Sequence, residues 1–273
     1  MADRRLVLGL AVLAVLAAYA VLVPAVAGVD DRVTDFAAAR QAPSADHPFG
    51  TDSAGRDLFV RTAAGLRVSL LIAAVCAVLS TVIGALVGAL SGVAGGWADR
   101  LAMRVVDGVN AVPHLLLGIV LVALFRGSLV AVVASIALTH WTQVARVVRA
   151  EVLSLRDRPH VDAAVLGGAT RWRVVHRHLL PAALPQALVA AVLLLPHAVW
   201  HESTLSFLGL GLPPHRASLG TLLEEARSSL LLGGWWTLAF PALGLVLATL
   251  AVAAVGSALR DRVALPQRVE VPR

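Results

Sequence analysis

The stretch SLLIAAVCAVLSTVIGALVGALSGV, residues 69–93, decides the fold class of this chain. It runs for 25 positions without a charged residue, and about 20 consecutive apolar residues are enough for a helix to cross the hydrocarbon core of a membrane. The whole chain is 58% hydrophobic and 15% charged, with a mean hydropathy of +0.81, whereas soluble domains carry about 25% charged residues. Because barrels are built from short alternating segments and this chain has long apolar runs, the sequence predicts an all-α integral membrane protein.

Five more apolar runs bring the predicted number of transmembrane helices to six, and they cover residues 6–29, 109–125, 129–141, 180–200 and 235–259. The first run is longer than the core of a signal peptide, so we expect an uncleaved span, with cleavage near Ala25-Val26-Ala27 as the alternative. The chain then divides into a first helix with the start of an outer loop, an interfacial segment, a core of five helices with a polar loop at 146–179, and a cytoplasmic tail, over residues 1–46, 47–67, 68–262 and 263–273.

The interfacial segment, 47–67, mixes charged residues with Leu58, Phe59 and Val60. This mixture is typical of a short amphipathic helix that lies in the membrane interface. We therefore expect it to lead into the second span as a separate element.

Three glycines in the second span, Gly84, Gly88 and Gly92, recur every four residues and share one helix face. Small residues at this spacing let the backbone of another helix approach closely. The neighbour is either another span of this chain or a helix of a second subunit, and the sequence leaves both open.

The basic residues argue against two functions. All 23 are arginine, and they do not form one patch with interleaved aromatic residues, so we expect no nucleic-acid partner despite the net charge of +6. A phosphate-binding loop of the Walker type needs a lysine. Any ATP and Mg would therefore be bound by a different chain, and we expect no cofactor in this one.

Arginine also predicts the orientation in the membrane. Fifteen arginines fall in segments on one side of the six spans and eight on the other. Because arginine-rich segments face the cytoplasm, both termini are expected there. Trp200, Trp235 and Trp236 would then lie at the outer boundary, where aromatic belts form.

Residues 161–181, VDAAVLGGATRWRVVHRHLLP, are a polar, arginine-rich island in this apolar chain. The pattern predicts a helix, a turn at Gly167-Gly168 where glycine supplies backbone freedom, and a new membrane helix beginning near Pro181. Such a loop would project from the bilayer as a compact knob. The alternative is a solvated connection between two spans.

The spacing of Asp162-Ala163-Ala164, Gly168 and Leu180-Pro181 resembles the cytoplasmic loop by which membrane subunits of bacterial ABC importers dock on their ATPases. The resemblance implies that these six residues couple the chain to an ATPase. Asp162 stands where the family usually has glutamate, so the charge is kept with a shorter reach.

Two further segments, HPFGTDSAGRDLFVRTAAGLRVSL at 47–70 and SFLGLG at 206–211, are similar to the C-type permease of the dipeptide, oligopeptide and nickel importer family. The resemblance implies a type I ABC importer permease fold in the bacterial inner membrane, working by alternating access. It implies as partners a homologous B-type permease, two ATPase subunits, an extracytoplasmic substrate-binding protein and membrane lipid. The substrate would be small peptides or nickel, free or chelated.

The end of the fifth span holds candidate residues of the translocation path. His197 and His201 are four apart on one helix face, followed by Glu202. Ionisable residues at membrane depth usually mark a pathway or a paired site, and imidazole is a suitable nickel ligand, which makes the two histidines candidate metal ligands. Phe207 and Gly209 lie in a helix break that we expect near the outer gate. The alternatives are rings that hydrogen-bond to carbonyls and a simple loop.

The sequence also bears on two other functions, an intramembrane hydrolase and a passive channel or scaffold. His201-Glu202 begins a zinc-protease pattern, but residue 205 is leucine where the second histidine is needed, and no Gly-x-Ser-x-Gly supports serine chemistry. An intramembrane hydrolase is therefore not supported. A passive channel or scaffold stays as the alternative to an importer subunit.

Overall fold

The computed structural model describes residues 2–27, 33–213 and 216–264, and this part of the chain is nearly all helical. The long helices are α1 (Ala2–Val26), α2 (Leu58–Ala94), α5 (Leu129–Arg156), α8 (Leu180–Phe207) and α10 (Trp236–Ala264). Each belongs to a stretch long and apolar enough to cross a membrane, and α3 (Gly96–Ala111) with α4 (His114–Leu124) forms a sixth candidate span bent by 78°. The prediction of an all-α protein with six spans is thus confirmed, provided that the bent pair counts as one.

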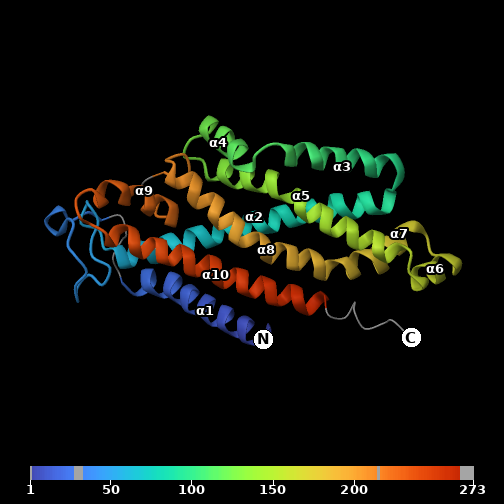
Figure 1. The fold of residues 1–273 in the computed structure, drawn as a ribbon, viewed down its shortest axis with the longest axis horizontal. Helices are drawn as coiled ribbons and strands as arrows, with labels where there is room; N and C mark the ends of the chain where they lie inside the picture. Colours follow the sequence, from blue (N-terminus) through green and yellow to red (C-terminus); the bar gives the residue numbers. More distant parts are fainter. Residues whose placement is uncertain (1, 28–32, 214–215, 265–273) are drawn as a thin grey trace.

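The helices form an elongated bundle (Figure 1). Helices α2 and α5 make the most extensive pairing, α8 packs against both, α1 pairs with α10 on one flank, and α3 and α4 lie on the other. The short helix α6 (Pro159–Leu166) marks one end of the bundle, here named the α6 end. Helix α9 (Leu219–Leu230) and the loop before α2 mark the other, the α9 end. Helix α1 begins and α10 ends on the side nearer α6.

The glycines of α2 face α5 of the same chain. A Cβ atom built on Gly84 would lie 2.5 Å from the carbonyl oxygen of Trp141, and one on Gly88 would lie 2.4 Å from that of Ala145. At Gly92 the nearest atom is a Val152 side-chain carbon at 2.9 Å. No side chain fits at Gly84 or Gly88, so the backbones of α2 and α5 touch there. The sequence did not decide which helix packs on these glycines; in the structure it is α5 of the same chain.

Helix α5 is much longer than the predicted fourth span, 129–141. It continues to Arg156 through the first part of the segment expected as a polar loop. The added turns stay helical because Val144, Val148 and Val152 are buried at a spacing of four against α2 and α8. The prediction placed the end of this helix too early because it relied on hydropathy alone.

The prediction of a single helix for the third span, residues 109–125, is wrong, because the structure has two helices there. Residues 96–111, mostly expected as a connection, form α3, and the chain bends before α4 at Pro113. Proline has no N–H for the preceding turn and restricts the backbone of the residue before it, which accounts for the break.

The predicted interfacial helix, 47–67, is also corrected. Residues 47–57 are a loop that folds onto α9 and α10, and the remainder is the start of α2. Asp57 caps α2 by accepting hydrogen bonds from the backbone N–H groups of Phe59 and Val60 at 2.8 and 3.1 Å. The charged side chains that suggested a position in the membrane interface instead form caps and ion pairs within the protein.

Those charges form an ion-pair cluster at the α9 end. The guanidinium of Arg61, 1% exposed, lies 2.6 Å from Asp52 and 2.6 Å from Glu225 of α9. Arg56 reaches the same two carboxylates at 2.7 and 3.0 Å. Because a buried arginine is tolerated only when it is paired, this cluster fixes the loop to α2 and α9.

The last two spans keep their predicted positions with shifted ends. Helix α8 runs seven residues past Trp200, to Phe207, so the connection expected from residue 202 starts later. Helix α9 begins inside that connection with a capping box between Ser218 and Thr221. The predicted tail, 263–273, lies outside the described residues from 265 onward.

Replacing Gly88 by alanine should destabilise the protein because the new methyl would overlap the α5 backbone. We expect a loss of roughly 1–3 kcal/mol, as for other overpacked sites, measured as a lower melting temperature in detergent. Gly108→Ala is the matched control, since a Cβ there meets no atom within 4 Å and alanine favours helix. Equal melting temperatures for the two variants would contradict the close α2–α5 contact.

Candidate functional site

The α6 end carries the predicted coupling residues on a projecting helix. Asp162 lies in the first turn of α6, where a helix dipole favours an anion, and it is exposed together with Ala163. Ala164 is half-buried. Val161, only 3% exposed, packs with apolar residues from α5 and from the chain after α6. The helix is therefore anchored on one side and free on the other.

The turn after α6 depends on Gly168. Its φ of +83° lies in the left-handed region that favours glycine, and the N–H of Ala169 donates to the carbonyl of Ala164 at 3.0 Å. This pattern closes the end of a helix with its orphan carbonyls satisfied. The turn returns the chain toward the bundle, so α6 stands as a compact knob.

Helix α8 begins at Leu180, as the sequence predicted, but no break separates it from the preceding helical turns. Helix α7 (Arg171–Val174) and a five-residue π-helical turn, Val175–Leu179, lead directly into α8. The π turn lies immediately before Pro181, which has no N–H to donate to the preceding turn. The helix of the fifth span thus starts near the α6 turn, without a break at Pro181.

The large, exposed apolar residues of the knob were not among the predicted coupling residues. Leu166 is 88% exposed, and Val165 and Trp172 are also largely exposed. Large apolar side chains this exposed outside the spans are typical of a protein interface. The sequence held a signal for this surface, because large apolar residues are unexpected inside a polar, arginine-rich segment.

Near the middle of the bundle, histidines from three helices lie together. The ring centroid of His140 on α5 lies 4.7 Å from that of His201 on α8 and 5.3 Å from that of His114 on α4. Nδ1 of His140 is 2.9 Å from the Ile136 carbonyl oxygen. His197, the other histidine predicted for the path, is exposed on the surface of the chain. His114 and His140 were not predicted, although histidines in apolar runs were visible in the sequence.

The histidine rings pack against one another rather than converge on a point. His140 and His201 meet edge to face, with an interplanar angle of 81°. Within residues 2–27, 33–213 and 216–264, no group of three or more His, Cys, Asp or Glu side chains is placed to hold a metal ion. The described part of the chain therefore offers no complete metal site at His197 and His201.

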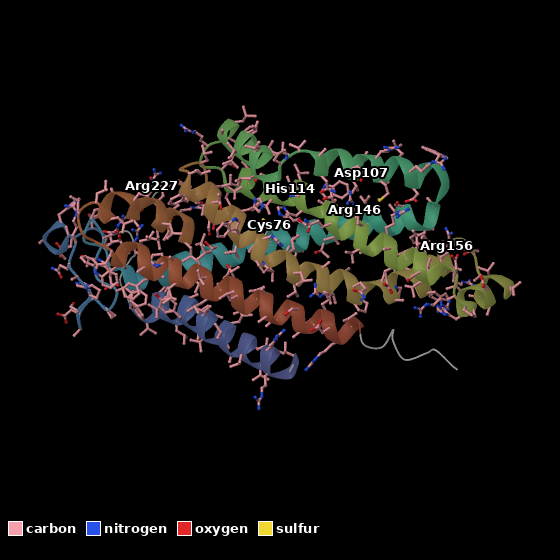
Figure 2. The ribbon with its side chains drawn as sticks, viewed as in Figure 1. Cys76, Asp107, His114, Arg146, Arg156 and Arg227 are labelled. Atoms are coloured by element: carbon pink, nitrogen blue, oxygen red, sulfur yellow. The ribbon has the colours of Figure 1, made fainter. Side chains whose placement is uncertain are left out.

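Polar pairs continue from the histidines toward the α6 end, between α3 and α5. The hydroxyl of Thr142 donates to the Asn110 side-chain oxygen at 2.8 Å, and one turn further Arg146 donates to Asp107 at 2.6 Å. Figure 2 shows His114, Asp107 and Arg146 along this side of the bundle. We name the set the polar track: His114, His140, His201, Asn110, Thr142, Asp107 and Arg146.

Glu202, predicted to line the path, is instead fully buried with 0% exposure. Its carboxylate accepts hydrogen bonds from Ser69 of α2 at 2.8 Å and from Ser206 of α8 at 2.9 Å. The Ser69 hydroxyl in turn accepts from the N–H of Leu219, the first residue of α9. Glu202 thus ties three helices together, and in the described part of the chain no cation pairs with it.

Phe207 and Gly209 lie where α8 ends and the chain turns toward α9. The guanidinium carbon of Arg227 lies 5.5 Å from the centre of the Phe207 ring, a cation–π distance, and Gly209 has a φ of +72°. Close by is an open cleft of about 870 Å³ between the loop before α2 and α9, lined by Ser53, Arg56, Glu224, Glu225, Arg227, Ser228 and Leu231. Both predicted residues are exposed at the α9 end.

Replacing Glu202 by leucine should destabilise the α9 end. The hydroxyls of Ser69 and Ser206 would lose their acceptor in buried surroundings, which costs about 1–3 kcal/mol. Glu202→Gln keeps an acceptor oxygen and should lose less. The measurement is the melting temperature in detergent, with Glu224→Leu in the open cleft as the control. If Glu202→Leu melts at the same temperature as the control, Glu202 does not hold the three helices together.

Comparisons with known proteins identify the family of the chain. Residues 80–265 match the family model described as "Binding-protein-dependent transport system inner membrane component". A Brucella abortus protein named as a peptide transport system permease is 37% identical over 96% of this chain and 88% of the relative. The Bacillus subtilis dipeptide transport system permease DppC is 35% identical over 80% of this chain and 68% of the relative.

Two solved structures share the fold at lower identity. An inward-facing MetNI methionine ABC transporter is matched with a TM-score of 0.60 at 21% identity, and an amino acid ABC transporter with 0.56 at 18%. In each case the match covers 74% of this chain and 94% of the other. The chain is a multi-pass membrane protein with the type I permease fold, and it belongs to the family of binding-protein-dependent transport system inner membrane components, which are permease subunits of ABC importers and not enzymes.

Proposed function

We propose that this chain is one of the two membrane subunits through which an ATP-driven importer passes small peptides across the inner membrane of a bacterium. The observation that carries the proposal is the likeness of 96% of the chain to relatives named as peptide transport permeases. Peptide is preferred to nickel because the described residues hold no three-ligand metal group. The names of the relatives likewise refer to peptides or dipeptides.

The proposed partners follow from the family. They are a homologous B-type permease, two ATPase subunits that bind ATP and Mg, and an extracytoplasmic binding protein that delivers the peptide. We place the α6 end and both termini in the cytoplasm, which the fifteen-to-eight arginine bias supports. The binding protein then approaches the α9 end, where the charged cleft lies open.

In this proposal α6 is the coupling helix. Asp162, Ala163, Ala164 and the exposed apolar side chain of Leu166 would enter a groove on the ATPase. The buried Val161 ties α6 to α5 and α8, so a displacement of the knob is passed to both spans. Gly168, Leu180 and Pro181 shape the return of the chain and do not need to touch the ATPase.

The exposed end of the polar track, Asp107 and Arg146, would face the translocation path. Asp107 and Arg146 are half-exposed within candidate spans, and charged groups in such segments face a water-filled cavity or another protein rather than lipid. The second permease would supply the opposite wall. Alternating access then requires that ATP-driven movement of α5 and α8 opens the track to one side of the membrane at a time.

Leu166→Asp should separate coupling from folding. A charge on this 88% exposed side chain leaves the core untouched, but it should weaken ATPase attachment by about tenfold or more, because a buried apolar anchor is lost from the interface. The readouts are co-purification of the ATPase with the permeases and ATP-dependent uptake of a dipeptide in vesicles.

The matched control is Leu231→Asp, which alters a leucine 89% exposed at the opposite end of the bundle. It should retain the ATPase. Full ATPase retention and uptake with Leu166→Asp would refute the coupling role of α6. Dipeptide uptake by the wild-type permeases without any ATPase would refute the importer and favour a passive channel.

A further inference from the structure

Two Asp–Arg pairs join α3 to α5, and they are built differently. In the first, Nε and Nη2 of Arg149 donate to the two oxygens of Asp99 at 2.5 Å each, and Ser91 donates to the same carboxylate. The side chains of Arg149 and Asp99 are 29% and 13% exposed. This pair is two-pronged and covered, as expected of a structural link.

The second pair is open. Nη2 of Arg146 donates to Oδ1 of Asp107 at 2.6 Å, and in the described part of the chain neither side chain makes another hydrogen bond. The side chains of Arg146 and Asp107 are 52% and 58% exposed. A guanidinium has five N–H donors and a carboxylate accepts at both oxygens, so most of the hydrogen-bonding capacity of this half-exposed pair is unused.

The position of the open pair restricts what it can face. Arg146 lies within α5, one helical turn beyond Thr142 and about two beyond the buried His140. The pair continues the polar track and lies in candidate spans, where exposed charge is costly in lipid. Its outer side must therefore meet water, a polar ligand or a polar partner.

We propose that Asp107 and Arg146 form a weak subsite for the charged termini of a peptide in transit. The free Asp107 oxygen accepts hydrogen bonds from the terminal ammonium, and the unused N–H groups of Arg146 donate to the terminal carboxylate. The occupant is identified by charge complementarity: an adjacent anion and cation match the two opposite charges at the ends of an unblocked dipeptide. The proposal rests on the peptide-import function above.

Recognition through the termini suits a transporter of many peptides, because it is independent of side chains. It must also be weak. A site on a path has to bind well enough to admit its cargo and loosely enough to release it. An open pair with one internal hydrogen bond satisfies this condition, since ligand bonds can form at the free donors and acceptor while the Asp107–Arg146 contact stays in place.

Photo-crosslinking in the purified complex of two permeases and two ATPases tests the proposal. The probe is a photoleucine–alanine dipeptide with free termini, presented without the binding protein so that only the membrane complex can select it. We expect crosslinks, mapped by mass spectrometry, to residues 104–111 and 142–147. Unlabelled dialanine should compete for them, whereas dialanine blocked at both termini should not.

Variants separate recognition from architecture. Asp107→Asn/Arg146→Gln should lower the crosslink yield and vesicle uptake of dialanine by about tenfold, with assembly and melting temperature unchanged. Asp99→Asn/Arg149→Gln, the matched control at the closed pair, should instead lower the melting temperature. If the first double variant fails to assemble, the wild-type crosslink map decides by itself.

Three outcomes would overturn the subsite: no crosslink at the two segments, equal competition by the blocked peptide, or full uptake by the assembled Asp107→Asn/Arg146→Gln complex. Failure of the proposed function is distinct, because the wild-type transporter with its binding protein would then not take up dialanine at all.

Discussion

The backbone contact between α2 and α5 is the constraint on which the rest of the structure depends. Gly84 and Gly88 leave no room for a side chain, so the carbonyls of Trp141 and Ala145 lie directly against α2. In a bilayer this closeness matters because helix association relies on packing and not on exclusion of water. Fixing α5 here also fixes the residues that flank the contact, from the histidines to Arg149, and the start of α6 beyond them.

The two ends of the bundle are held by different forces. At the α9 end, Arg61 and Glu202 are buried polar groups that tie the loop and α9 to the spans by hydrogen bonds and ion pairs. Such contacts are directional, and breaking one leaves a costly unpaired group. At the α6 end, the knob is held by apolar packing around Val161. Apolar contacts can shift without losing a partner, which suits an element proposed to move.

The sequence predicted the parts of the fold that depend on local composition. Six apolar runs, the glycine face of α2 and the knob around Asp162 could be read directly. The end of α5 could not, because Gln143, Arg146 and Arg149 lower the hydropathy while Val144 and Val148 between them are buried. Here a spacing of four residues held more information than the mean hydropathy did.

Contacts between segments far apart in the chain could not be predicted from the sequence. The charges in 47–57 suggested an interface because their partner, Glu225, lies more than 160 positions along the chain. Glu202 looked like a path residue because an acidic group in a span is costly, and the serines that satisfy it come partly from α2. Likewise His140 and His201 belong to different spans and meet only in the folded chain. Their roles depend on neighbours that no local pattern identifies.

The shape of α5 explains how one rigid contact is compatible with movement. The helix has 28 residues, about 42 Å at 1.5 Å per residue, and it touches Gly84 and Gly88 near its middle. A helix held near its centre and pushed at one end tilts, so its halves move in opposite directions. In the proposed importer, a push on α6 would shift the last turns of α5 one way and the turns before His140 the other. The close contact that prevents sliding is therefore also the point about which the track can open to one side and close to the other.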